Sequence, residues 1–126
     1  MRDLVSNIGV APAIAAVVNS AAADGIAVDL KGFNRVAFVI STGAIGGAGD
    51  FGVKVQESDD GAAFTDAASS AVLGSVPATL LAASAYKLGY IGFKRYVRLA
   101  LTKAGGTSIA LGAVAILGDP NRAPVA

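Results

Sequence analysis

Residues 51–66 read FGVKVQESDDGAAFTD and contain the clearest strand and turn in the chain. The first five residues alternate large apolar side chains with small or polar ones, which is the two-residue period of a half-buried strand. The segment Asp59-Asp60-Gly61 then predicts a turn, because Asp tolerates left-handed backbone and Gly accepts a positive φ without steric cost. Phe64 is expected to return the chain to the core. Together these residues predict a strand that ends in a well-specified turn.

The same stretch is the most acidic part of the chain, with carboxylates at Glu57, Asp59, Asp60 and Asp66. Carboxylates along a turn can converge on a calcium ion with backbone carbonyls, but this spacing differs from that of a helix–loop–helix calcium loop. Catalysis by paired carboxylates needs two acids across a cleft, whereas Asp59 and Asp60 are neighbours on a tight turn. The pattern favours a solvated turn and leaves calcium binding as an open alternative.

The rest of the chain also shows strand patterns. Arg35–Ser41 and Thr107–Leu117 are apolar on both faces, which indicates two central strands. An edge strand is expected after Pro12, since proline cannot donate a hydrogen bond to a neighbouring strand. Further short strands are expected at residues 26–30, 86–90 and 94–102. Hairpin loops are expected at Gly43–Asp50 and Ala104–Gly106, and Leu80 and Leu81 are expected to fill one end of the core.

About eight short strands, separated by turn signals at intervals of roughly ten to fifteen residues, predict an all-β fold. No amphipathic helix interrupts them. We therefore expect one antiparallel β-sandwich of jelly-roll-like type that forms a single domain over residues 1–126. Residues 1–10 are expected to form an extended N-terminal arm and residues 119–126 an extended C-terminal tail.

The composition indicates a partly covered surface. Only 15% of the 126 residues are charged and 54% are apolar, whereas an ordinary soluble domain has roughly 25% charged residues. A surface with so little charge favours a protein whose outer faces are covered by copies of itself or by a larger assembly. A compact, alanine-rich monomer is the alternative.

Several function classes are disfavoured by the residues that are missing. The chain has no Cys and no His, which removes thiolate chemistry, the commonest zinc ligand and the commonest general base. The net charge of +1 without a basic run gives no case for nucleic-acid binding. No apolar run approaches the roughly 20 residues of a membrane helix. The glycine-rich residues 43–50 precede a strand and lack the lysine of a phosphate-binding loop. We expect a protein that is not an enzyme and has no cofactor, metal, nucleic-acid or membrane partner.

One basic cluster stands out, at Lys94, Arg95 and Arg98. Lys94 and Arg98 share a strand face with Tyr96 between them, while Arg95 is expected to point inward or to lie at the frayed start of the strand. Tyr and Arg often supply much of the energy of an interface, so the cluster could contact an acidic partner. It could equally be an ordinary sheet face with a cross-strand partner such as Glu57.

A set of short motifs, read in order, resembles the head decoration (cement) proteins of tailed bacteriophages. The motifs are Asn7-Ile8-Gly9-Val10, Asp29-Leu30 with Gly32-Phe33, Gln56-Glu57-Ser58-Asp59-Asp60-Gly61, Tyr86-Lys87-Leu88-Gly89-Tyr90, Lys94-Arg95-Tyr96-Val97-Arg98, and Gly118-Asp119-Pro120 with Ala123-Pro124-Val125. The resemblance covers nearly the whole chain, and it includes no catalytic motif.

The resemblance implies a jelly-roll-like module on the outer surface of an icosahedral phage head, where it bridges major capsid proteins. It also implies a virion location and a homo-oligomer, either a dimer or a trimer. The arms and the basic strand are then the expected contacts. The candidate partner-binding residues are Arg2, Asn7, Ile8, Lys94, Tyr96, Arg98, Pro120, Arg122 and Pro124.

A second resemblance supports a different class. The ESDDG turn followed by Phe64 and the later RYVRL strand are similar to discoidin-like and related sugar-binding sandwiches. Such modules recognise sugars through exposed aromatic side chains or a metal, whereas this chain has no Trp and only three Tyr. Two of these, Tyr86 and Tyr90, are expected in the core. A carbohydrate-binding module displayed on a virion for host adhesion is the alternative function.

Overall fold

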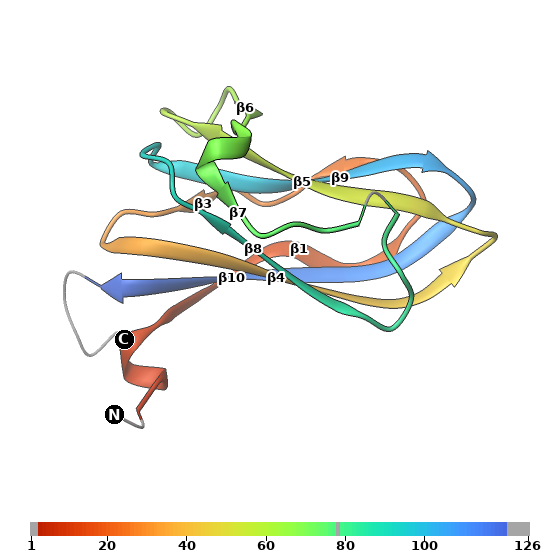
Figure 1. The fold of residues 1–126 in the computed structure, drawn as a ribbon, viewed down its shortest axis with the longest axis horizontal. Coiled ribbons are helices and arrows are strands. Elements are labelled where there is room, and N and C mark those ends of the chain that lie inside the picture. The colour runs from red at the N-terminus through yellow and green to blue at the C-terminus, as the bar shows by residue number, and fades with distance from the viewer. Residues whose placement is uncertain (1–2, 78, 121–126) are drawn as a thin grey trace.

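The computed structural model describes residues 3–77 and 79–120 and shows two packed antiparallel sheets (Figure 1). Sheet A has the strand order β1-β10-β4-β8-β7, and sheet B has the order β2-β9-β5-β6, with β3 also paired to β9. In sheet A the strands are β1 (Gly9–Asn19), β4 (Phe33–Gly46), β7 (Val72–Leu73), β8 (Ala85–Tyr90) and β10 (Ser108–Pro120). In sheet B they are β2 (Ala23–Asp24), β3 (Val28–Asp29), β5 (Asp50–Ser58), β6 (Thr65–Asp66) and β9 (Tyr96–Gly105). Two single-turn 3₁₀ helices, η1 (Val5–Asn7) and η2 (Ser69–Ala71), complete the described elements.

The strand pairing is nested, and this nesting defines the topology. The first strand pairs with the last, β2 and β3 pair with β9, β4 pairs with β8, and β5 pairs with β6. A long antiparallel ribbon that folds over on itself to form two sheets has this pairing, and it is the pattern of a jelly roll. The predicted all-β sandwich is therefore confirmed, although several of its strands are longer than expected, β4 most of all.

The alternating residues of the central strands form the core. Val36, Phe38 and Ile40 of β4 are buried, as are Val97 and Leu99 of β9. The prediction of two central strands is confirmed because β10 lies between β1 and β4, and β4 lies between β10 and β8. The edge strand after Pro12 is also confirmed, since β1 lies at the edge of sheet A.

One end of the core is closed by a single leucine. Leu80 is fully buried, and its N–H donates a hydrogen bond of 2.9 Å to the carbonyl of Phe51. Leu81 was expected to share this role, but 62% of it is exposed. Leu80 is held inward by its backbone bond, and the next side chain of an extended segment points to the opposite side.

The two predicted hairpins are wrong. Strand β4 runs to Gly46 in sheet A and β5 begins at Asp50 in sheet B, so residues 47–49 cross between the sheets. The segment after β9 crosses back in the same way, and the two crossings lie side by side because Gly46 pairs with Ser108 and Asp50 with Gly105. We call this the arch end of the sandwich. The local glycine signal predicted a turn correctly, but the strands on either side of each turn pair with other strands.

The arms are shorter than predicted. Gly9 and Val10 belong to β1 and pair with Leu117 and Ile116, so the segment before the sandwich ends at Ile8. Asp119 and Pro120 belong to β10, and Pro120 lies opposite Phe33. The predicted contacts Arg2, Arg122 and Pro124 lie outside the described residues. In the described part of the chain no helix is long and apolar enough to cross a membrane.

Candidate functional site

The acidic turn after β5 is organised by hydrogen bonds to its own backbone. The Asp60 carboxylate accepts N–H groups from Ala62 and Ala63 at 2.9 and 3.1 Å and the Ser58 hydroxyl at 2.9 Å. The two backbone N–H donors are the main cause of the Asp60 pKa falling to about 2. Such a carboxylate that caps local N–H groups has a structural role. Among the described residues, no group of three or more Asp, Glu, His or Cys side chains is placed to hold a metal ion.

The remaining acids of this stretch point in different directions. Asp66 accepts from Gln56 at 2.9 Å and pairs with Lys54 at 3.1 Å on the outer face of sheet B. Glu57 turns toward the other sheet and accepts the Tyr90 hydroxyl at 2.7 Å. Burial, together with this bond, raises the pKa of Tyr90 to about 12. No two of these carboxylates face each other across a cleft, as a carboxylate pair in catalysis requires.

The predicted position of Phe64 is wrong. It is only half-buried and lies on the outer side of sheet B, where the guanidinium of Arg98 sits 4.2 Å from its ring centre. An arginine over an aromatic face is a favourable cation–π contact. The turn thus returns to the surface of the sheet and not to the core.

The basic cluster is balanced by partners within the chain. Lys94 pairs with Asp59 at 2.8 Å, and Arg95 holds Asp29 through two bonds of 2.9 and 2.8 Å. Arg95 therefore points outward, not inward as one alternative predicted. The Arg98 guanidinium donates to the side-chain amide oxygen of Gln56 at 2.8 Å and lies 3.4 Å from the Asp24 carboxylate. Gln56 and Asp24 take the place of the expected partner Glu57, and these contacts favour the reading of an ordinary sheet face.

Tyr96 also has a local structural contact. It is half-buried, and its ring lies 3.4 Å from where a Cβ on Gly61 would be. It covers the acidic turn, and the Arg95 guanidinium lies 5.0 Å from its ring centre. Tyr96 and Arg98 thus hold the turn against sheet B.

The outer face of sheet A has the opposite character. We call its centre the uncharged face. Its residues form successive rows across β1, β10 and β4: Val10, Ile116 and Ala37; Pro12, Val114 and Val39; Ala16, Gly112 and Ser41; Val18, Ala110 and Gly43. None of them is charged, and most are partly or fully exposed. Arg35, Lys87 and Asp119 lie only at its borders.

The two outer faces therefore differ sharply. Four of the five ion pairs among the described residues belong to sheet B or its loops, and the fifth, Arg35 with Asp119, lies at the border of the uncharged face. Sheet B carries a polar surface whose charges are paired. Sheet A exposes an apolar surface that none of the described residues covers.

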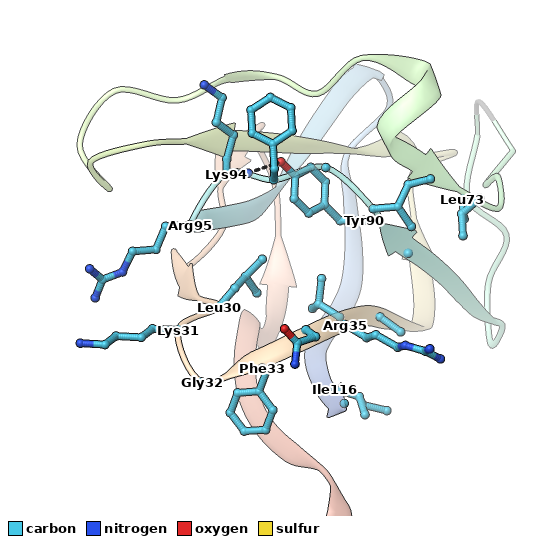
Figure 2. A pocket seen from close by; sticks show the side chains of 18 residues that line it. Leu30, Lys31, Gly32, Phe33, Arg35, Leu73, Tyr90, Lys94, Arg95 and Ile116 are labelled. Carbon is cyan, nitrogen blue, oxygen red and sulfur yellow. Dashed lines mark hydrogen bonds between the residues drawn. The ribbon is translucent and has the colours of Figure 1, made fainter. Parts of the chain in front are cut away.

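A groove of about 1160 Å³ opens at the end of the sandwich opposite the arches (Figure 2). Its walls come from the β3–β4 turn, the β8–β9 loop and the last part of β10. The apolar side chains that line it are Leu30, Phe33, Val36, Leu73, Tyr90, Ile91, Phe93 and Ile116. Three of these are unusually open to solvent, since Phe93 is 93% exposed, Ile91 57% and Leu73 56%. We call this the groove end.

The polar lining of the groove is cationic. Lys31 and Arg95 lie on one side and Arg35 on the other, with Leu30 between them, and no carboxylate lines the groove (Figure 2). Arg95, Lys94 and Arg35 form ion pairs with Asp29, Asp59 and Asp119, which do not line the groove. Lys31 has no ion pair with any described residue. The groove therefore combines an apolar floor with a small excess of positive charge.

The six predicted partner-binding residues that the structure describes fall into two groups. Lys94 lines the groove, Pro120 lies opposite the groove residue Phe33, and Asn7 and Ile8 precede Gly9, whose backbone packs against the Phe33 ring. These four lie at the groove end. Tyr96 and Arg98 lie on sheet B and are occupied by the contacts described above.

Sequence reasoning missed Phe93, Ile91 and the uncharged face. The signal for the loop was present, because the alternation of β8 stops at Tyr90 and resumes only at Tyr96. The signal for the face was read as burial, since strands that are apolar on both sides are usually covered on both sides.

No protein-family model matches the sequence, and no curated protein matches it either.

Proposed function

We propose that this protein is a non-enzymatic structural protein of a tailed-phage virion. In this proposal it binds the outer surface of the icosahedral head and stabilises contacts between major capsid proteins. The observation that carries the proposal is the groove end, where an exposed phenylalanine and an apolar groove lie beside four of the residues expected to bind a partner. An exposed aromatic side chain beside an apolar groove supports a docking surface at this end.

Phe93 is the central contact in the proposal. A phenylalanine that is 93% exposed on the short loop between β8 and β9 contributes nothing to the core. Large aromatic side chains that insert into a partner's pocket often carry most of an interface's energy. Lys31 and Arg35 at the rim favour a partner surface with carboxylates.

Binding to a capsid would rely on many copies acting together. A module held at several points on a repeating shell gains effective concentration, so weak individual contacts are sufficient. The expected homo-oligomer would add to this effect because linked copies engage neighbouring capsid subunits at the same time. The paired charges of sheet B support this division of roles, since they leave that face soluble and free of unpaired charge.

The experiment mixes purified protein with empty heads that lack it and images them by electron cryo-microscopy. Ordered density on the outside of the shell supports the proposal, and bare shells at saturating protein contradict it. Phe93→Ala should weaken binding tenfold or more, on the order of the loss of an interface anchor. Leu81→Ala is the matched control, because Leu81 is 62% exposed near the arch end and should have no effect on head binding.

The lengths of β1 and β10 limit where the chain can be truncated to test the terminal contacts. Removing residues 1–10 or 119–126 would delete the pairs of Gly9 and Val10 with β10 and of Pro120 with Phe33. Loss of binding in such variants would mix unfolding with loss of contacts. A truncation that ends before Gly9 leaves β1 complete and tests the predicted N-terminal contacts Arg2, Asn7 and Ile8 together.

The second candidate is the carbohydrate-binding module, and the exposed ring of Phe93 beside a groove favours it. Sugars stack on exposed aromatic faces, and pockets for small ligands are concave and largely apolar. Glycan binding by the isolated protein that is lost in Phe93→Ala, with no density on empty heads, would replace the capsid proposal with this one.

A further inference from the structure

We infer that the uncharged face of sheet A is a self-association surface, and that two copies of the chain pack there face to face about a two-fold axis. The inference deepens the proposed function, because it assigns a surface to the expected homo-oligomer, but it concerns the protein alone and requires no capsid. It rests on the rows of β1, β10 and β4 centred on Val114 and Val39.

The chemistry of the face points to a partner without charge. From Val36 to Gly46 on β4, from Gly9 to Asn19 on β1 and from Ser108 to Gly118 on β10, the chain has no charged residue. A charged partner surface would lose hydration at this face and gain no ion pair in return. The other two described surfaces are both charged, since sheet B carries several ion pairs and the groove end is lined by cationic side chains. The uncharged face is therefore best complemented by another uncharged face.

Symmetry then selects the same face of a second copy. In a two-fold contact one patch meets itself, so both apolar faces are covered at once and the assembly closes. A head-to-tail contact would bury this face against a charged surface of the next copy and leave another uncharged face open. An uncharged patch also avoids the repulsion that arises when a charged patch meets its own image.

The shape of the face permits close packing of two sheets. Its last two rows contain Ala16, Gly112 and Ala110, and a Cβ added at Gly112 would lie 2.9 Å from the Cβ of Ala16. These small residues leave a shallow depression in the face, next to the larger side chains of Val114 and Val39. Two sheets with interdigitating side chains pack roughly 10 Å apart, as in a sandwich core. The border residues Arg35, Lys87 and Asp119 would form the polar rim that surrounds such a contact.

The size of the face sets the expected affinity. With strands about 4.8 Å apart and a rise of about 3.3 Å per residue, three strands and eight residues span roughly 14 by 26 Å. That corresponds to about 380 Å² per copy and about 760 Å² for the pair, which is small for a specific interface and typical of a weak, transient one. We therefore expect a weak, reversible dimer with a dissociation constant on the order of 100 μM.

The test is sedimentation velocity of the full chain from about 1 μM to about 1 mM, a range chosen to bracket that constant. The natural protein should shift from monomer to dimer across this range. Val114→Lys, which places a charge at the centre of the face where 40% of Val114 is exposed, should weaken dimerisation tenfold or more. Thr102→Lys is the matched control, because Thr102 is exposed on β9 in sheet B and should leave the dimer unchanged.

A second variant keeps the test valid if the first one does not fold. If circular dichroism shows that Val114→Lys is unfolded, Val10→Lys takes its place, since Val10 is 66% exposed near the start of the edge strand. A protein that stays monomeric at the highest concentration overturns the inference, as does an oligomer that persists in the folded lysine variant or that is disrupted equally by Thr102→Lys. Head binding is measured separately through Phe93→Ala, so a failure of self-association and a failure of the capsid proposal are distinguishable.

Discussion

Replacing Tyr90 with phenylalanine tests how the two sheets are joined at the groove end. Tyr90 lies in β8 of sheet A and is 4% exposed, and its hydroxyl donates to Glu57 of β5 in sheet B at 2.7 Å. The same oxygen accepts the backbone N–H of Lys94 at 3.2 Å. Tyr90→Phe keeps the ring in the core and removes only the atom that joins sheet A, sheet B and the β8–β9 loop.

The expected loss follows from the kind of bond. A hydrogen bond to a charged group contributes about 1.5–3 kcal/mol, and the half-buried position of Glu57 places this one near the lower value. We expect the free energy of unfolding to fall by about 1.5 kcal/mol, a change of roughly 5 °C in the melting temperature for a domain of this size. Tyr96→Phe is the control, since the Tyr96 hydroxyl makes no hydrogen bond to any described residue, and it should change stability by less than about 0.5 kcal/mol.

Urea unfolding measures both variants, and a double-mutant cycle with Glu57→Ala isolates the pair. The two substitutions should be non-additive by at least about 0.5 kcal/mol. Additivity within about 0.3 kcal/mol would show that the hydroxyl and the carboxylate do not interact, and would refute the reasoning.

The pH dependence of stability gives a second measurement of the same bond. The pKa of Tyr90 is raised to about 12, so the folded state favours the protonated phenol. The stability from this group is fully present below the unfolded pKa of about 10 and is lost as the pH rises toward 12. The natural protein should therefore lose stability more steeply than Tyr90→Phe between pH 10 and 12.

Three further predictions follow from single contacts. Gly106→Ala should destabilise the protein by about 2 kcal/mol or more, because Gly106 has a φ of 77° and the backbone of residues 48–49 leaves no room for a Cβ. Gly105→Ala is the control and should change the stability little, since open space surrounds Gly105. Urea unfolding of both variants measures the difference. Asp60→Asn should flatten the acid side of the stability profile, since the lowered pKa of Asp60 contributes stability above pH 4 that is lost as the pH falls toward 2, and an unchanged profile would contradict this. Phe38→Ala should lower the free energy of unfolding by about 3–5 kcal/mol, because the Phe38 ring is fully buried. Phe93→Ala should lower it by less than about 0.5 kcal/mol, because Phe93 is 93% exposed. Thermal unfolding compares the two variants, and equal losses of stability would show that Phe93 is packed.

The strands and their buried faces could be predicted from the sequence. The side chains of a strand alternate between its two sides, so Val97 and Leu99 had to share a face while Tyr96 and Arg98 took the other, and the structure has this arrangement. The acidic turn was also predictable as a turn, because Asp60 and Gly61 form it through bonds to residues at most three positions away.

Pairing across sheets could not be predicted locally. A glycine-rich turn has the same residue preferences whether it joins two neighbouring strands or crosses from one sheet to the other. The crossing at residues 47–49 exists because β4 pairs with β10 and β8, strands that lie far from it in the sequence. The choice between hairpin and arch is made by these long-range pairs.

The candidate surfaces show the same division. The sequence by itself determined that the chain is an all-β protein with little charge, no histidine and no cysteine, and hence that few kinds of chemistry are open to it. Only the tertiary structure decided that Phe93 lies open at the groove end and that Val39 and Val114 share an uncovered face. The physical reason is that the alternation of residues along one strand specifies which face of the sheet each side chain occupies. Whether that side chain is exposed depends on whether another element packs over the face.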